Sequence, residues 1–242
     1  ILETETFKSH NQSTEDIYSI RRYTSIIDRN QNERCRIWNL HGEINVPISI
    51  MLGLDHYCGS VSKLDAYVKG NYEFQENREN IKVKTMITKL KENKFDNRSW
   101  AELFFNSDVH ILGLSLDYSE TDLWWILTKR ARILNEVKTS TLIKNKIYFY
   151  DRHLTEEKEG LLKSLNIFVI KPKNDSDKIS WNEYYINTIK EIKTKLLITT
   201  EMIYDDLDAD GNMEAFHFAM SDGQLIDAEF FTIKNNTIIP YT

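Results

Sequence analysis

The sequence has few cysteine, proline and glycine residues. It contains only 2 Cys, 3 Pro and 8 Gly in 242 residues. Cys35 and Cys58 are too few and too far apart for a disulfide framework or a CxxC zinc ribbon, so we expect reduced thiols and no structural metal. The low proline and glycine content excludes collagen-like and broadly disordered chains.

Long apolar runs and an excess of positive charge are also missing. No apolar run approaches the roughly 20 residues that cross a bilayer, and no basic-then-apolar leader opens the chain. The 31 basic and 37 acidic side chains give a net charge of −6, which argues against nonspecific nucleic-acid binding. We therefore expect a cytoplasmic chain without a membrane or nucleic-acid partner. Because it opens at Ile1 inside a polar stretch, we expect a fragment or a processed chain.

The sequence does have enough apolar residues to fold, with 41% hydrophobic and 12% aromatic residues. Short apolar runs alternate with amphipathic stretches, and three of these runs predict buried strands: residues 109–114, 146–150 and 167–170. A capping residue is expected to open the helix after each of them: Ser119, Thr155 and Ser180. This alternation is typical of an α/β fold with a parallel, Rossmann-like sheet.

The flanking segments complete the expected organisation. Residues 35–40 predict a further strand buried on both faces, and residues 48–52 a second short apolar segment after Pro47. Residues from about 60 to 106 are charged and helical in pattern, which indicates a helical insertion. We expect residues 1–204 to form one α/β domain and residues 205–242 a β-rich appendage.

Two predicted strand ends carry residues suited to ligand binding. Ligands of open parallel sheets sit beyond the carboxyl ends of the strands. His41 and Gly42 follow one predicted strand, and Gly113 and Ser115 follow another. A glycine lets a ligand approach the backbone closely, and the Ser115 hydroxyl can bond a ribose or phosphate oxygen. The two ends are expected to line one cleft.

These motifs, in this order, resemble the sirtuin-like fold. Leu40-His41-Gly42 follows a strand, Gly113-Leu114-Ser115-Leu116 comes later in the chain, and residues 147–150 form the next strand. The resemblance covers about residues 35–185. It is closest to the divergent, zinc-free sirtuin-like proteins of bacterial phage defence, including AbiH-type abortive-infection proteins. In those proteins an acidic residue and a helix follow the Gly-x-Ser-Leu turn, and Asp117 and Asp122 are the acidic candidates here.

The resemblance implies a reaction on NAD as substrate. His41 would act as general base toward a ribose hydroxyl or water while nicotinamide departs. The residues implied in holding NAD are Gly42, Gly113, Ser115, Leu116 and Tyr150. The zinc module of protein deacetylases is missing from the sequence, so the expected reaction is NAD hydrolysis. The family's Gly-rich phosphate loop and its catalytic Asn segment are also not found, so we expect little or no turnover from these 242 residues.

Several alternatives stay open at this stage. The same fold could be a non-catalytic module that binds a nucleotide or a protein, either a second copy of itself or a defence partner. Gly113 and Ser115 could form a plain turn, and we expect Trp124 and Trp125 to pack in the core. The acidic motif Asp206-x-Asp208-x-Asp210-Gly211 matches the start of a calcium loop, but His217 stands where the last Glu belongs, so a solvated acidic turn is the competing interpretation.

Overall fold

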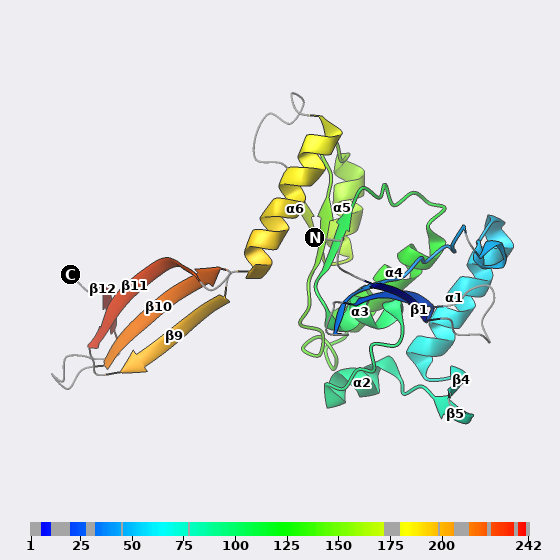
Figure 1. Cartoon of the computed structure of the whole chain (residues 1–242), viewed down its shortest axis with the longest axis horizontal. Helices are drawn as coiled ribbons and strands as arrows, with labels where there is room; N and C mark the ends of the chain where they lie inside the picture. Colours follow the sequence, from blue (N-terminus) through cyan, green and yellow to red (C-terminus); the bar gives the residue numbers. More distant parts are fainter. Residues whose placement is uncertain are drawn as a thin grey trace. The chain divides into compact units, whose positions relative to one another are not determined.

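A computed structural model describes residues 6–10, 20–27, 32–44, 46–76, 78–171, 180–197, 199–205, 213–221, 224–234 and 237–240. The chain divides into two compact units, Ile1–Pro172 and Lys173–Thr242 (Figure 1). This boundary falls earlier in the chain than the division at residue 204 expected from the sequence. The candidate site residues all lie in the first unit.

A parallel sheet of three strands forms the centre of the first unit. Its strands are β6 (Val109–Leu112), β7 (Ile147–Tyr150) and β8 (Ile167–Ile170), in the order β6-β7-β8. Two helices follow β6 and β7: α4 (Thr121–Asn135) and α5 (Glu156–Ser164). The prediction of a mixed α/β fold with a parallel sheet is therefore confirmed, because all three expected strands form and pair in parallel.

One face of this sheet belongs to the core. Ile147 and Phe149 of β7 are fully buried, and Ile167 of β8 is 2% exposed, so alternate residues of neighbouring strands point to the same side. The same apolar cluster includes Ile126 of α4 and Leu162 of α5. These helices therefore bury one face of the sheet and fix the loops that join them to the strands.

The helix caps were predicted with mixed success. The Thr155 hydroxyl accepts a hydrogen bond from the Lys158 amide, and the Ser180 hydroxyl accepts one from the Glu183 amide, so both of these caps are confirmed. The cap expected at Ser119 is wrong. Helix α4 begins two residues later, at Thr121, with no side-chain cap, because the acidic side chain of its first turn contacts another part of the chain.

Residues 35–40 do not form a strand buried on both faces, and that prediction is wrong. The strand observed is β3 (Glu33–Ile37), the edge of an antiparallel sheet with β2 (Tyr23–Ile27) and β1 (Thr6–His10). Cys35 is exposed and Ile37 is 40% exposed. Trp38 and Leu40 pack on the core from beyond the strand end, which explains why the alternation of apolar residues was imperfect.

The insertion expected at about residues 60–106 is mainly helical. It contains α1 (Gly53–Lys69), α2 (Met86–Glu92) and α3 (Trp100–Asn106). A hairpin of β4 (Glu73–Glu76) and β5 (Glu79–Lys82) was not predicted, and the apolar segment after residue 46 is a 3-10 turn, Pro47–Ser49. A buried ion pair between Lys89 and Glu102 joins α2 to α3.

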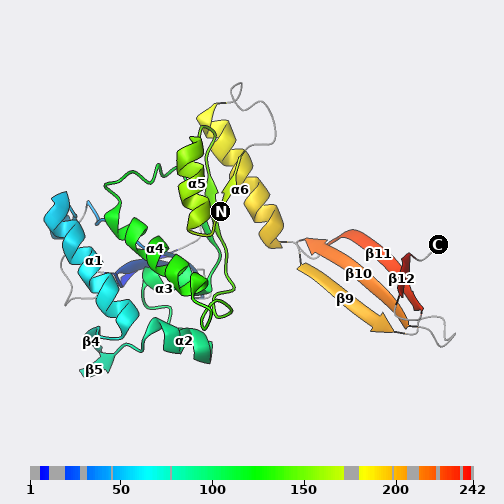
Figure 2. The ribbon, with the colours of Figure 1, turned by 180° about the vertical axis from the view of Figure 1, so that it is seen from behind.

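The second unit contains α6 (Trp181–Leu197) and an antiparallel sheet. Its strands are β9 (Thr199–Asp205), β10 (Met213–Ser221), β11 (Gln224–Lys234) and β12 (Thr237–Pro240), in the order β12-β11-β10-β9 (Figure 2). The calcium motif at Asp206, Asp208 and Asp210 lies outside the described residues. Among the helices that the structure describes, none has the length and apolar character of a membrane span.

Candidate functional site

A tight loop after β3 holds His41 in place. The His41 carbonyl accepts a hydrogen bond from the Met51 amide at 3.0 Å, and the Gly42 amide donates to the Asn39 carbonyl at 3.1 Å. Gly42 has φ +105°, and a Cβ there would lie 2.4 Å from the Ser49 carbonyl oxygen. Only glycine fits this position without a shift of the backbone, so Gly42 sets the path of the chain beside His41.

The imidazole of His41 faces the carboxylate of Asp122. Nε2 lies 3.2 Å from Oδ2 and 3.3 Å from Oδ1, although the two residues are 81 positions apart in the chain. Asp122 is fully buried in the first turn of α4. Its Oδ1 accepts a hydrogen bond from the Leu123 amide at 2.9 Å, and its Oδ2 accepts one from the Ser60 hydroxyl at 3.4 Å. The carboxylate is therefore held from three sides.

Two further side chains face the same imidazole. Glu120 Oε2 lies 3.6 Å from His41 Nε2, and the Tyr57 ring of α1 meets the imidazole edge to face at a centroid distance of 5.3 Å. The hydrogen bond to Asp122 raises the pKa of His41, burial opposes this shift, and the charges of Asp122 and Glu120 add to it. Burial, with Glu120 and Asp122 nearby, raises the pKa of Tyr57.

The connection from β6 to α4 carries the other predicted site residues. Gly113 has φ +67° and Leu116 has φ +48°, so the loop turns sharply at both positions. The Ser115 side chain is exposed, and its carbonyl accepts a hydrogen bond from the Lys158 ammonium. The Leu116 side chain is 2% exposed and packs in the core, so Leu116 can offer a ligand only its backbone.

Tyr150 and the tryptophans have partners inside the protein. The Tyr150 hydroxyl lies 2.8 Å from Nδ1 of His110, in hydrogen-bond contact across the parallel sheet. Trp124 and Trp125 are half-buried against the core, in line with the expected packing role, and Trp124 Nε1 donates to the Asp117 carbonyl at 3.0 Å. The Asp117 carboxylate is exposed, so Asp122 is the one of the two acidic candidates that meets His41.

An apolar cavity of about 690 Å³ adjoins these segments. Its walls include Leu40, Leu116 and Leu123, which are the chain neighbours of His41, Ser115 and Asp122. The volume falls within the roughly 300–1,000 Å³ typical of small-molecule sites. Of the predicted site residues only Leu116 lines this cavity, and the residues that line it do not include His41, Ser115 or Asp122.

Among the described residues, one group has the spacing of a metal site. The ligand atoms of His41, Glu120 and Asp122 all lie within 4.8 Å of one another. A divalent cation could be held by this set of one imidazole and two carboxylates. His41 and Asp122 also contact each other directly, whereas Glu120 Oε2 is buried without a hydrogen-bond partner among the described residues.

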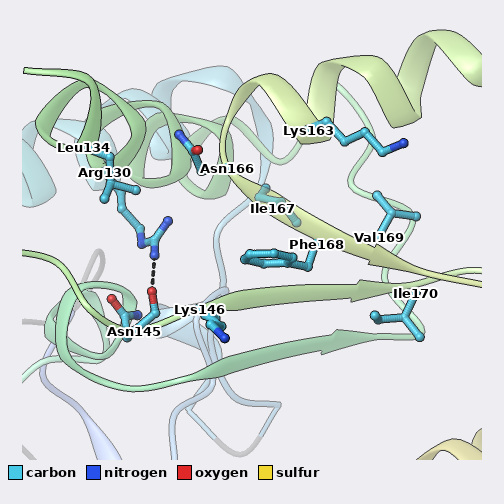
Figure 3. Close-up of a pocket in the computed structure, with 10 residues that line it drawn as sticks. All are labelled: Arg130, Leu134, Asn145, Lys146, Lys163, Asn166, Ile167, Phe168, Val169 and Ile170. Atoms are coloured by element: carbon cyan, nitrogen blue, oxygen red, sulfur yellow. Dashed lines mark hydrogen bonds between the residues drawn. The ribbon is translucent and has the colours of Figure 1, made fainter. Parts of the chain in front are cut away.

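A second cavity, of about 510 Å³, lies beside the edge strand β8 (Figure 3). Arg130 of α4 reaches the loop before β7 and donates from Nη2 to the Asn145 carbonyl at 2.6 Å. Burial lowers the pKa of Arg130 to about 10. The residues that line this cavity include none of the predicted site residues. The hydrogen bond of Arg130 links α4 to the loop before β7.

Comparisons with protein-family models, with curated proteins and with solved structures found no match. The candidate site is therefore defined by the geometry. Sequence reasoning found His41 and offered Asp122 as one of two acidic candidates, but it missed Ser60, Tyr57 and Glu120. Ser60 and Tyr57 lie on α1, and no local pattern distinguishes them from other polar residues of that helix. Glu120 was missed because it lies in the segment that was wrongly predicted to cap the helix from Ser119.

Proposed function

We propose that this protein is a sirtuin-like NAD hydrolase that releases nicotinamide and serves in anti-phage defence. In this proposal the parallel sheet is part of a Rossmann-like fold with a helical insertion and a β-rich appendage. One observation carries it: the His-Gly turn meets the helix that follows the Gly-x-Ser-Leu turn, through His41 and Asp122. His41 and Asp122 are 81 positions apart in the chain, and their contact brings the His-Gly turn to the start of α4, the helix that follows the Gly-x-Ser-Leu turn.

The chemistry follows from a basic imidazole beside a held carboxylate. In NAD hydrolysis the bond between the ribose C1′ and the nicotinamide nitrogen breaks, and the electron pair leaves with nicotinamide. A water oxygen forms the new bond to C1′ and gives up a proton. In this proposal the neutral imidazole of His41 accepts that proton as general base, in the pH range above its raised pKa. The negative charges of Asp122 and Glu120 stabilise the imidazolium that results.

The loop from β6 to α4 supplies the groups proposed to hold NAD. Backbone amides after Gly113 and the exposed hydroxyl of Ser115 are suited to ribose oxygens. Gly42 contributes through the loop path beside His41, because the backbone of Ser49 and Ile50 fills the space where its side chain would be. Tyr150 lies at the end of β7, where the resemblance implies the adenosine. Its side chain is only 9% exposed and its hydroxyl contacts His110, so it would offer a ligand only the exposed edge of its side chain.

The test is nicotinamide release from NAD by the longest native form of the protein that contains these residues. Release by the wild type and its loss in His41→Ala support the proposal. His153→Ala is the matched control, since His153 is an exposed histidine outside the site, and we expect it to keep the wild-type rate. If the wild type releases no nicotinamide, or if His41→Ala releases it at the wild-type rate, the proposal fails.

The alternative is a module of the same fold that binds without turnover. The direct contact between His41 and Asp122 supports catalysis, because a carboxylate that orients an imidazole suits a general base. In a binding module the same contact would serve only to pair a buried carboxylate. Calorimetry with NAD separates the two: heat of binding without nicotinamide release would establish the non-catalytic module, which could be a homo-oligomer or dock on a defence partner protein.

A further inference from the structure

The buried carboxylate of Asp122 is surrounded by donors. The Leu123 amide and the Ser60 hydroxyl each donate to one of its oxygens, and both oxygens lie within 3.3 Å of His41 Nε2. The side chain has no exposed surface, so water does not compete for these oxygens. A carboxylate in this setting acts only as an acceptor, and the imidazole nitrogen that faces it must act as the donor.

This arrangement determines the tautomer of His41. A neutral imidazole has one N–H and one lone pair, and which nitrogen has the hydrogen is decided by the hydrogen bond that each makes. With Nε2 donating to Asp122, the lone pair is on Nδ1. Among the described residues, none makes a hydrogen bond to Nδ1, and the His41 side chain is 32% exposed. Nδ1 is thus the nitrogen available to a ligand.

We infer that Asp122 is a positioning residue that holds His41 as the Nε2–H tautomer, so that Nδ1 is the atom that accepts a proton from the substrate or from water. The catalytic part of this inference rests on the proposed function, whereas the tautomer depends only on the contact between the two side chains. Asp122 itself touches no substrate. It acts through the orientation and the proton affinity of the imidazole.

The neighbouring groups support the same role. The Tyr57 ring limits rotation of the imidazole on one side, and the loop through Gly42 fixes its backbone. The titratable groups that face His41 are Asp122 and Glu120 at the start of α4 and Tyr57 on α1. Ser60 on α1 holds Oδ2 of Asp122, so the orientation depends on the contact between α1 and α4.

Nitrogen-15 NMR of the wild-type protein, labelled at histidine, tests the tautomer directly. In the neutral form of His41 we expect the shift of a protonated Nε2 and an unprotonated Nδ1. A signal from protonated Nδ1 would overturn the inference, whether or not the protein cleaves NAD. This measurement needs no variant, so it does not depend on how any substitution folds.

Variants then test the positioning role. Asp122→Asn should lower the pKa of His41 in the NMR titration and lower kcat by about 10²-fold or more, since a general base contributes roughly 10²–10⁴-fold, while KM for NAD changes little. Ser60→Ala, which removes one donor to Asp122 but keeps the carboxylate charge, should lower kcat by less than Asp122→Asn does. Asp55→Asn is the matched control, because Asp55 is an exposed acidic residue in the first turn of α1.

The outcomes separate this inference from the proposed function. If Asp122→Asn leaves the pKa and the tautomer of His41 unchanged, the positioning role is wrong. If the titration shifts as expected but the native wild type releases no nicotinamide, the proposed function fails and the tautomer assignment stands. If Asp122→Asn raises KM for NAD and leaves kcat unchanged, Asp122 is a binding residue and the inference is overturned.

Discussion

At the scale of single residues, the backbone at Gly42 leaves no space for a side chain. Its φ of +105° is unfavourable for any residue with a side chain, and a Cβ would lie 2.4 Å from the Ser49 carbonyl oxygen. We expect Gly42→Ala to lower the free energy of unfolding by about 1–3 kcal/mol or more, and to displace His41. Chemical denaturation measures the first effect and the His41 NMR signals the second.

Gly160 provides the control for this substitution. It lies inside α5, and a Cβ there has no atom within 4 Å. Gly160→Ala should therefore raise the free energy of unfolding by about 0.5–1 kcal/mol, since alanine favours a helix over glycine by that amount. Equal effects of the two substitutions would contradict the geometry described for Gly42.

The raised pKa of His41 predicts a pH-dependent stability. The hydrogen bond to Asp122 is the main cause of the shift, so the protonated imidazole is favoured in the folded state. This contribution to the free energy of unfolding is complete below the unfolded pKa of about 6.5 and is lost as the pH rises through the folded pKa.

Urea denaturation measures the effect. The free energy of unfolding of the wild type should exceed that of His41→Gln by more at pH 5.5 than at pH 9. The difference should be of the order of 1 kcal/mol, because part of the imidazole is exposed. A constant difference would rule out the linkage.

The proposed function predicts a reaction without a metal ion, because His41 acts there as a general base beside Asp122. EDTA should then change neither the melting temperature nor the rate of nicotinamide release. Added Zn²⁺ or Mn²⁺ should give no increase in either. Activity that is lost in EDTA and restored by one of these ions would instead make His41, Glu120 and Asp122 metal ligands.

At the scale of elements, a buried ion pair holds the helical insertion together. Lys89 of α2 is 1% exposed and pairs with the fully buried Glu102 of α3, which also accepts a hydrogen bond from the Tyr67 hydroxyl at 2.6 Å. Lys89→Met would leave the Glu102 carboxylate buried beside Tyr67 without its cation. We expect a loss of about 3–5 kcal/mol in the free energy of unfolding, measured by chemical denaturation.

The exposed pair of Lys84 with Glu92 is the matched control, because it has the same chemistry at the surface. Lys84→Met should cost less than about 1 kcal/mol. A similar loss for the two variants would mean that burial does not determine the strength of the Lys89 pair.

The elements also show which patterns could be predicted. The parallel strands were recognised because each is a short apolar run, and the caps at Thr155 and Ser180 because they depend on residues close in sequence. The start of α4 was misplaced because Asp122 makes a contact across the fold. Strand β3 was misjudged because Ile37 and Trp38 favour extended backbone, a preference that does not say whether a partner sheet covers them.

At the scale of the whole molecule, the candidate site was predicted only in part, because it is assembled from distant segments. His41 could be found from its motif, and Asp122 only as one of two candidates. Ser60 and Tyr57 contribute through the packing of α1 near α4, which no local pattern reports. The division into two units also depends on contacts across the chain, and it falls before α6, where the strand–helix alternation gave no sign of a boundary.

The separation of His41 and Asp122 has a consequence during synthesis. His41 is made before Asp122, which follows 81 residues later, so the pair does not exist on the ribosome until the first turn of α4 has emerged. A nascent or truncated chain that stops before this helix has the histidine without the group that orients it. If the protein consumes NAD, its own cell is protected from incomplete copies, because only a chain that has folded from α1 through α4 has the assembled pair.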